Sequence, residues 1–492
     1  MIENSPTIVA ALVAYMAICL LLGFLAYRRT RTLGDFILGG RKLGSWVTAF
    51  SAQASDMSGW LLMGLPGLAY LAGFDAVWLA LGLTIGTWLN WRFIAAKLRT
   101  HTERLADSLT LPDYFERRFD DRTRLLRTIT AAFILVFFAF YASSGFVAAG
   151  RLFETLFAMS YVEAIFWGSI VMLAYTFFGG FLAVSWSDVL QGTLMFVALV
   201  LVAALGIQLA GGVAPALDEL AARDPALLDP WAGDGGEALG VIGVLSLLGW
   251  GLGYPGQPHI LARFMAIRRA EELTTSRRVA MVWVVTVLAA AVIVGLTGVL
   301  VLDPPLEGAA SETVFIRLAT EFLHPALAGV CLAGILAAIM STASAQLLVS
   351  SSAFAQDFYR GLFRTNAGRT ELLWVGRLAV LVIAVIAFLL GLDPESRVLS
   401  LVAWAWAGFG AAFGPAIVLS LYWEGMTRNG ALAGIVVGGL TVIVWPQLEG
   451  PLFELYELVP GFLLSCAAIV AVSLLESGRV ARLVKQDTGV SS

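Results

Sequence analysis

The stretch "SAQASDMSGW", residues 51 to 60, places a carboxylate and several small polar side chains inside an apolar segment that runs from Trp46 past Tyr70. An aspartate at the centre of a membrane helix costs about 2.5 to 3.5 kcal/mol on insertion scales, so it normally faces a polar cavity or a partner. We therefore expect the helix to be interrupted near Asp56, beside the Ser58–Gly59 pair. The alternative is that Asp56 is a hydrogen-bonded group that only stabilises helix packing.

The composition indicates whether this aspartate lies in a soluble protein or in a membrane protein. The 492 residues are 59% hydrophobic and 13% charged, whereas soluble domains are roughly 45 to 50% apolar and about 25% charged. Mean hydropathy is +0.84. These values indicate an integral membrane protein. The net charge of −4 argues against a nucleic-acid partner, because such binding needs a clustered basic surface.

Apolar runs of about 20 residues, bounded by charged or turn residues, predict about thirteen membrane helices. They are expected at residues 7–27, 46–72, 76–96, 126–156, 162–183, 189–211, 238–262, 279–302, 325–358, 371–391, 398–423, 430–448 and 459–475. The first segment has no basic residues before it, so we expect it to stay as a span and not to act as a signal peptide. The longest connections, 97–125 and 213–237, are too short for a catalytic domain.

Basic residues gather on one side of these expected spans. With the N-terminus outside, about 25 of the 31 Lys and Arg residues lie inside, as the excess of basic residues in cytoplasmic loops requires. About four lie outside, namely Arg151, Arg223, Arg317 and Arg397. The bias predicts an outside N-terminus and a cytoplasmic C-terminus. Arg41, just before the first interrupted helix, is either one of these topology charges or part of a cytoplasmic gate.

A second irregular stretch is "GWGLGYPGQPHI", residues 249 to 260, in which four glycines and two prolines interrupt an apolar span. Proline lacks the backbone donor of a helix and glycine weakens a helix further. Counted from the second span, each interrupted helix opens a group of five, and because five is odd the second group enters from the opposite side. This arrangement predicts an inverted repeat with a binding site at the membrane midplane.

A third polar cluster is "AAIMSTASAQLLVSSSAFAQD", residues 337 to 357. Ser341 and Thr342 are adjacent, so their hydroxyls can point into one neighbouring gap. Hard cations prefer oxygen ligands, and an unwound helix frees backbone carbonyls for a cation. The cluster and the interrupted helix therefore predict a cation site. The alternative is that both hydroxyls bond to carbonyls of their own helix.

Four motifs together resemble the sodium:solute symporter family, most closely its bacterial sodium/proline symporters. They are "FILGGRKLG" (36–44), "SAQASDMSGWLLMGLPG" (51–67), "WGLGYPGQPHILARFMAI" (250–267) and "AGILAAIMSTASAQLL" (333–348). The resemblance implies an all-α membrane protein with the leucine-transporter-like fold, a five-plus-five inverted repeat with flanking helices. We expect one transmembrane domain over 1–492, made of an extra helix and loop (1–45), a first repeat (46–212), a second repeat (213–424) and C-terminal helices with a cytoplasmic tail (425–492).

The resemblance also implies a sodium site. Its ligands would be the carbonyls of Ala54, Met57 and Ala338 and the hydroxyls of Ser341 and Thr342. Asp56 would support sodium binding without necessarily touching the ion. Asp188 either assists sodium passage or caps the helix expected to start near residue 189, and Gln191 shares that uncertainty.

The substrate would lie beside the ion, with its carboxylate near Ser58 and Gly59. Its ring would lie among Trp60, Tyr141, Trp250, Tyr254 and Pro258. The last three are spaced at i, i+4 and i+8, so they would share one face if the segment stayed roughly helical. Without the resemblance, Tyr141, Trp250 and Tyr254 would be read as packing or membrane-interface aromatics.

The implied function is sodium-coupled uptake of L-proline by alternating access in a bacterial inner membrane, by a secondary transporter and not an enzyme. Sodium is the only expected cofactor, and proline, sodium and lipid are the expected partners. The same type of transporter could carry another small solute, such as a different amino acid, a carboxylate or a sugar. A sensor is disfavoured because only about 17 residues follow the last span, and a passive channel would need no pair of interrupted helices.

Overall fold

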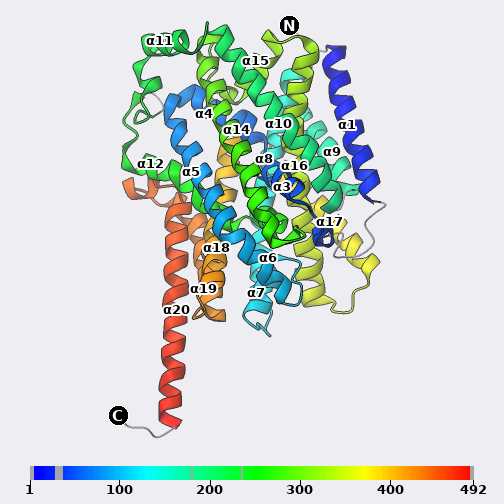
Figure 1. Cartoon of the computed structure of the whole chain (residues 1–492), viewed down its shortest axis with the longest axis vertical. Coiled ribbons are helices and arrows are strands. Elements are labelled where there is room, and N and C mark those ends of the chain that lie inside the picture. Colours follow the sequence, from blue (N-terminus) through cyan, green and yellow to red (C-terminus); the bar gives the residue numbers. More distant parts are fainter. Residues whose placement is uncertain (1–4, 28–36, 179–180, 234–235, 488–492) are drawn as a thin grey trace.

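The computed structural model describes residues 5–27, 37–178, 181–233 and 236–487, which form helices joined by loops. The longest helices pack side by side, and the two chain ends lie at opposite ends of the molecule (Figure 1). These helices are α1 (Pro6–Tyr27), α8 (Leu125–Phe157), α10 (Phe181–Leu209), α14 (Leu273–Val301), α16 (Pro325–Ser352), α17 (Arg369–Leu390), α18 (Val398–Tyr422) and α20 (Leu458–Asp487). The shorter helices are α5 (Ala76–Leu89), α6 (Ala95–Arg104), α7 (Leu111–Arg118), α9 (Tyr161–Phe178), α11 (Val213–Arg223), α15 (Val314–Phe322) and α19 (Arg428–Val444).

The expected all-helical membrane architecture is confirmed. Within the described ranges, nine helical runs are long and apolar enough to cross a membrane. Three shorter apolar helices accompany them, at Tyr161–Leu173, Gly240–Gly256 and Trp374–Leu390. One of the nine runs, Trp60–Arg104, is 45 residues long and covers parts of two predicted spans. Length and composition alone therefore do not separate thirteen spans, and that number stays a prediction.

The first predicted interruption is confirmed. Helix α3 (Ser45–Asp56) ends where Met57 takes φ −85° and ψ 83°. The chain resumes as a π-helical turn, η2 (Trp60–Gly64), and continues as α4 (Leu65–Ala72). A non-helical residue at mid-membrane depth is tolerated only where it is buried in protein or lines a cavity, and Met57 is fully buried.

The second predicted interruption is confirmed as well. Helix α12 (Gly240–Gly249) tightens into a 3-10 turn, η7 (Trp250–Gly256). Gln257 is extended, with φ −82° and ψ 106°, and α13 (Pro258–Ala266) starts after it. Proline is well suited to the first position of a helix because its missing donor is not needed there.

One predicted helix boundary is wrong. The spans at 162–183 and 189–211 were expected to meet between residues 183 and 189, but α9 ends at Phe178 and α10 already begins at Phe181. Residues 181 to 188 therefore belong to the later helix. Asp188 lies seven residues inside α10 and does not cap it.

Helix α16 occupies the centre of the bundle and positions the polar cluster. In its most apolar window, 83% of the residues are buried, and it packs against α3, α8 and α10. In α1 and α17, by contrast, large apolar side chains such as Val13 and Leu378 are more than 60% exposed. Exposed apolar faces suit contact with lipid, whereas buried Ser and Thr on α16 must find partners inside the protein.

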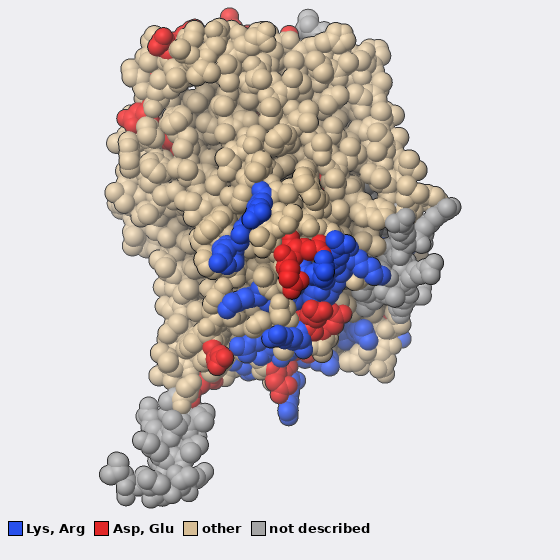
Figure 2. All heavy atoms as spheres, in the orientation of Figure 1, with Lys and Arg blue, Asp and Glu red and all other residues tan. Residues whose placement is uncertain are grey.

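Lys and Arg side chains gather in the half of the molecule that also holds the C-terminus (Figure 2). We call this half, which contains α6, α7 and the loop before α8, the basic end. Arg41 is part of it, because its Nε lies 2.6 Å from Asp107 and its Nη1 donates to the Met265 carbonyl at 2.6 Å. Arg41 therefore joins the N-terminal segment to α13 as well as contributing charge. The predicted inside residues Arg28, Arg29 and Arg31 lie outside the described residues.

Replacing Gly86 by alanine should destabilise the fold, because α5 approaches η7 backbone to backbone. A Cβ added at Gly86 would lie 2.3 Å from the Gly251 carbonyl oxygen, so one of the two elements must move. Overpacking of this kind costs about 1 to 3 kcal/mol, and the melting temperature of the purified protein in detergent measures it. Gly23→Ala is the matched control, since nothing lies within 4 Å of its Cβ position. Equal melting temperatures for the two variants would contradict this packing.

Candidate functional site

Two distant segments meet where the first helix is interrupted. In a continuous helix the Ala54 carbonyl would accept the Ser58 amide, but Ser58 N donates to the Asp56 carbonyl at 3.1 Å instead. The Ala54 carbonyl accepts two hydroxyls of α16, from Ser341 at 2.6 Å and from Thr342 at 3.3 Å. The interruption thus frees a carbonyl oxygen and turns it toward the α16 hydroxyls.

The hydroxyls of this cluster do not simply bond within their own helix. Ser341 Oγ also lies 3.1 Å from the Ala338 carbonyl, farther than its 2.6 Å contact with Ala54. The structure therefore brings together four of the five expected sodium ligands. The fifth, Met57, donates its amide to the Gln53 carbonyl at 2.9 Å, and its own carbonyl belongs to the irregular backbone beside the cluster.

Asp56 lies next to this cluster and is 1% exposed. Neither of its carboxylate oxygens has a hydrogen-bond partner of ordinary geometry in the described part of the chain, although Tyr254 is near enough to interact with it. Burying a carboxylate without hydrogen bonds or a counter-charge is costly. The packing interpretation requires well-formed hydrogen bonds to Asp56, which the described residues do not supply.

Trp60 and Tyr141, both predicted to contact the substrate, converge on one atom. The Asp56 carbonyl accepts the Tyr141 hydroxyl at 3.3 Å and the Trp60 indole N–H at 3.4 Å. Ser58 Oγ accepts the Trp60 amide at 3.5 Å. A Cβ on Gly59 would lie 2.8 Å from the Ala148 Cβ, so a glycine lets the interruption lie against α8.

Trp250 and Tyr254 of the second interruption face the first one. The Trp250 ring lies 6.5 Å from the Trp60 ring, between centroids. Pro258 is separated from them, because a 3-10 turn has about three residues per turn and Gln257 is extended. The expected single face of Trp250, Tyr254 and Pro258 therefore does not form. Pro258 instead borders a cavity on the side of the basic end.

Several polar residues that the sequence analysis did not select satisfy the carbonyls of the second interruption. Asn90 Nδ2 donates to the Tyr254 carbonyl at 3.2 Å, and Trp406 Nε1 donates to the Trp250 carbonyl at 2.8 Å. Gln257 Nε2 reaches the carbonyls of Gly253 and Trp406, both at 3.2 Å. Gln257 lies inside the quoted motif and Asn90 is a single amide in an apolar run, so the local sequence could have identified both as candidate site residues. Nothing in the local sequence distinguishes Trp406.

Asp188 belongs to a separate buried cluster. Its Oδ2 accepts the Ser51 hydroxyl at 2.6 Å and lies 3.4 Å from Arg263 Nη2. Arg263 is fully buried and also donates to Ser51 Oγ at 3.1 Å. The cluster joins α3, α10 and α13. Gln191 contacts a different element, because its Nε2 donates to the Tyr15 hydroxyl of α1 at 2.9 Å.

Two solved structures resemble this arrangement of helices. A sodium-coupled sialic acid symporter in a substrate-bound outward-open state superposes with a TM-score of 0.78 at 20% identity, over 95% of this chain and 98% of that chain. Mhp1, a nucleobase-cation-symport-1 family transporter in a closed conformation, superposes with a TM-score of 0.55 at 15% identity, over 90% and 96%. At these identities the likeness shows the fold.

Sequence comparison extends this result to the family. The sodium/proline symporter of Escherichia coli K12 is 49% identical over 488 residues, covering 98% of this chain and 96% of that protein. The high-affinity proline transporter PutP of Bacillus subtilis is 46% identical over 463 residues, covering 93% and 95%. The model of the sodium:solute symporter family matches residues 36–438. This chain belongs to the sodium:solute symporter family.

Proposed function

We propose that this protein is a sodium-coupled symporter that takes up L-proline by alternating access. The observation that carries the proposal is the meeting of the freed Ala54 carbonyl with the Ser341 and Thr342 hydroxyls, beside the Asp56 carboxylate, which has no basic partner among the described residues. The full-length relatives that are named for proline transport support the choice of substrate. Membership of the family makes the protein a secondary transporter and not an enzyme.

Sodium would bind among the oxygens at the junction of α3 and α16. The ligands would be the carbonyls of Ala54, Met57 and Ala338 and the hydroxyls of Ser341 and Thr342. A hydroxyl has one hydrogen and two lone pairs, so rotation of the Ser341 and Thr342 hydroxyls can turn their lone pairs toward a cation. Oxygen ligands suit a hard cation, and Asp56 would supply the negative field.

Proline would lie on the other side of the interruption. Its carboxylate would approach Ser58 and Gly59, where the helix η2 begins and where helix dipoles favour negative charge. Its apolar ring would contact the aromatic wall of Trp60, Tyr141, Trp250 and Tyr254. Pro258 would contact the substrate on the side of the basic end, because it borders the cavity there.

The repeat architecture is part of the same proposal. The first repeat (46–212) would hold five spans, namely α3 with α4, α5 with α6, α8, α9 and α10. The second repeat (213–424) would hold α12 with α13, α14, α16, α17 and α18. With α1 before them and α19 and α20 after them, this assignment gives the thirteen expected spans. The basic end would face the cytoplasm of a bacterium and the N-terminus the outside, as the distribution of Lys and Arg suggests.

Coupling to sodium would drive accumulation through the membrane potential as well as the sodium gradient. Proline is a zwitterion without net charge, so one sodium ion carries one positive charge inward with it. At 100 mV this charge is worth about 2.3 kcal/mol, which corresponds to somewhat under two decades of accumulation at about 1.4 kcal/mol per decade.

Labelled L-proline should accumulate in right-side-out membrane vesicles when an inward sodium gradient is imposed, because uptake is driven by sodium entry. The same vesicles with potassium on both sides are the control. Uptake that does not respond to sodium would reject the proposed function. A panel of competing amino acids, carboxylates and sugars in the same assay would show whether proline is the preferred solute.

Asp56→Asn should weaken sodium binding, because the amide keeps the shape of the side chain and removes its charge. We expect the half-saturating sodium concentration to rise about tenfold or more, equivalent to about 1.4 kcal/mol. Proline uptake measured as a function of sodium concentration tests this expectation. An unchanged sodium dependence would support a packing role for Asp56.

Ser341→Ala should also raise the half-saturating sodium concentration, by about tenfold, since a contact with a charged group is worth about 1.5 to 3 kcal/mol. Ser344→Ala is the matched control on the same helix, because the Ser344 hydroxyl donates to the Ser341 carbonyl at 3.0 Å and not to α3. The same effect in both variants would argue against Ser341 as a ligand.

A further inference from the structure

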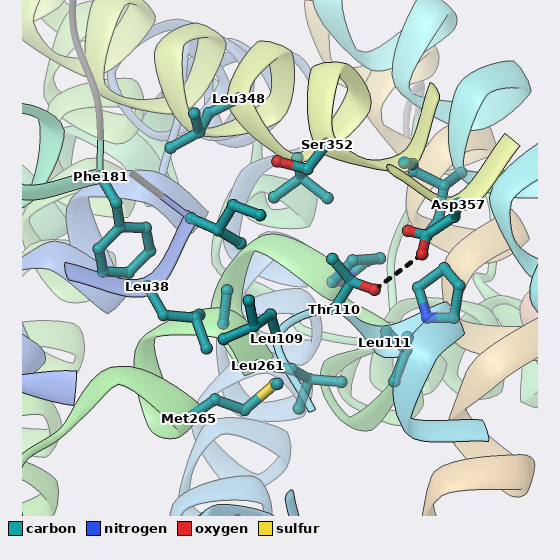
Figure 3. A pocket seen from close by; sticks show the side chains of 17 residues that line it. Leu38, Leu109, Thr110, Leu111, Phe181, Leu261, Met265, Leu348, Ser352 and Asp357 are labelled. Carbon is teal, nitrogen blue, oxygen red and sulfur yellow. Dashed lines mark hydrogen bonds between the residues drawn. The ribbon is translucent and has the colours of Figure 1, made fainter. Parts of the chain in front are cut away.

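A narrow cavity lies between the proposed substrate site and the basic end. It holds about 30 Å³ of free space and is bordered by Pro258 at the start of α13. Its walls are mostly apolar, with Leu38 and Phe181 at one end and Asp357 and Thr110 at the other (Figure 3). The space suits a water molecule and is too small for a proline ring, so the walls must separate before a substrate can pass.

A wider cavity of about 500 Å³ lies on the far side of Asp357 and Thr110. It is lined by charged and polar residues, namely Asp107, Asp113, Arg117, Arg124, Arg127, Gln356, Arg360 and Thr365. Asp357, Thr110, Leu109 and Ile37 border both cavities. These four residues therefore form the constriction between a narrow apolar space and a wide polar opening.

Asp357 is the acid in the wall of the narrow cavity, and it is only partly satisfied. It belongs to the π-helical extension of α16, η10 (Ala353–Phe363), and is 1% exposed. Its Oδ1 accepts the Thr110 hydroxyl at 3.2 Å and Arg127 Nε at 2.9 Å. Its Oδ2 is buried and has no hydrogen-bond partner within the described ranges. A purely structural ion pair at this depth would be expected to satisfy both oxygens.

Arg127 does not depend on Asp357 alone. It lies 2.5 Å from Asp113 and 3.0 Å from Glu116, both on α7. If Asp357 turned away, the guanidinium would still have two carboxylates beside it, so no unpaired arginine would be left. The constriction can therefore open at lower cost than the separation of an isolated buried ion pair, which would strand both charges.

We propose that the narrow cavity is a release subsite for the transported amino acid, in which the free oxygen of Asp357 binds the ammonium group of the substrate on its way to the cytoplasm. This inference rests on the proposed function. The ligand is a zwitterion with a small apolar side chain. Once the walls separate, its ring would contact apolar side chains such as Leu261, and its ammonium group would make a charge-assisted hydrogen bond with Asp357 Oδ2.

The test compares Asp357→Asn with Asp113→Asn. Asparagine keeps the shape of Asp357 and an acceptor for Thr110 but loses the charge that attracts an ammonium group. Asp113 also pairs with Arg127 but does not border the narrow cavity, so it controls for general damage to the ion-pair network. Proline transport is measured from the cytoplasmic side in inside-out vesicles and from the external side in right-side-out vesicles.

We expect Asp357→Asn to raise the cytoplasmic-side KM for proline about tenfold, the effect of losing one charge-assisted contact, with a smaller change in the external-side KM. Asp113→Asn should leave the ratio of the two KM values unchanged. Equal effects of the two variants on that ratio would overturn the release subsite. Absence of sodium-dependent uptake by the unaltered protein would instead overturn the proposed function.

A second variant keeps the inference testable if Asp357→Asn does not assemble. Leu261→Phe adds volume to the cavity wall without touching the ion pairs, so release should slow and turnover should fall about fivefold or more in a space this small. Sodium-dependent binding of proline at equilibrium should persist and would show that the variant is folded. Turnover of the Leu261→Phe variant at the rate of the unaltered protein would overturn the proposal.

Discussion

The structure depends on how backbone carbonyls are satisfied where two helices are interrupted inside the bundle. Lipid offers no hydrogen bonds at that depth, so each freed group needs a partner inside the protein. The Ala54 carbonyl accepts hydrogen bonds from the Ser341 and Thr342 hydroxyls, and the Trp250 carbonyl accepts one from the Trp406 indole N–H. Each partner comes from a helix far away in the sequence. The hydrogen bonds that satisfy the backbone at the interruptions thus also hold the residues of the proposed site together.

Buried acids in this protein differ in what compensates their charge. Asp188 lies beside Arg263, and Asp357 lies beside Arg127. Asp56 has no such arginine among the described residues, where the uncharged Tyr254 hydroxyl lies near its carboxylate. An acid without a fixed counter-charge gains more from an added sodium ion than one beside an arginine. This contrast favours Asp56 over Asp188 and Asp357 as the acid that attracts the ion in the proposed sodium site.

The sequence predicted the features that have a local cause. Glycine, proline and a mid-span aspartate predicted the two interruptions, and the adjacent hydroxyls of Ser341 and Thr342 predicted the polar face of α16. The early start of α10 was missed because Asp188 is the kind of residue that caps the start of a helix, although it lies inside α10. Trp406 and Arg263 were missed for another reason. Their roles arise from contacts with residues more than 70 positions away, which no local pattern encodes.

The buried cluster at Asp188 links the site to its exit. Ser51 on α3 and Arg263 on α13 both contact this residue of α10, so the basic-end halves of the two interrupted helices are tied to each other. Leu261, on α13, therefore belongs to the same unit as the Ala54 carbonyl. Asp357 belongs to the opposite wall, because it continues α16 and is held to α8 and α7 through Arg127. Separation of these two walls would open the narrow cavity and the α3–α16 junction together, so loss of the ion and release of the solute would share one movement.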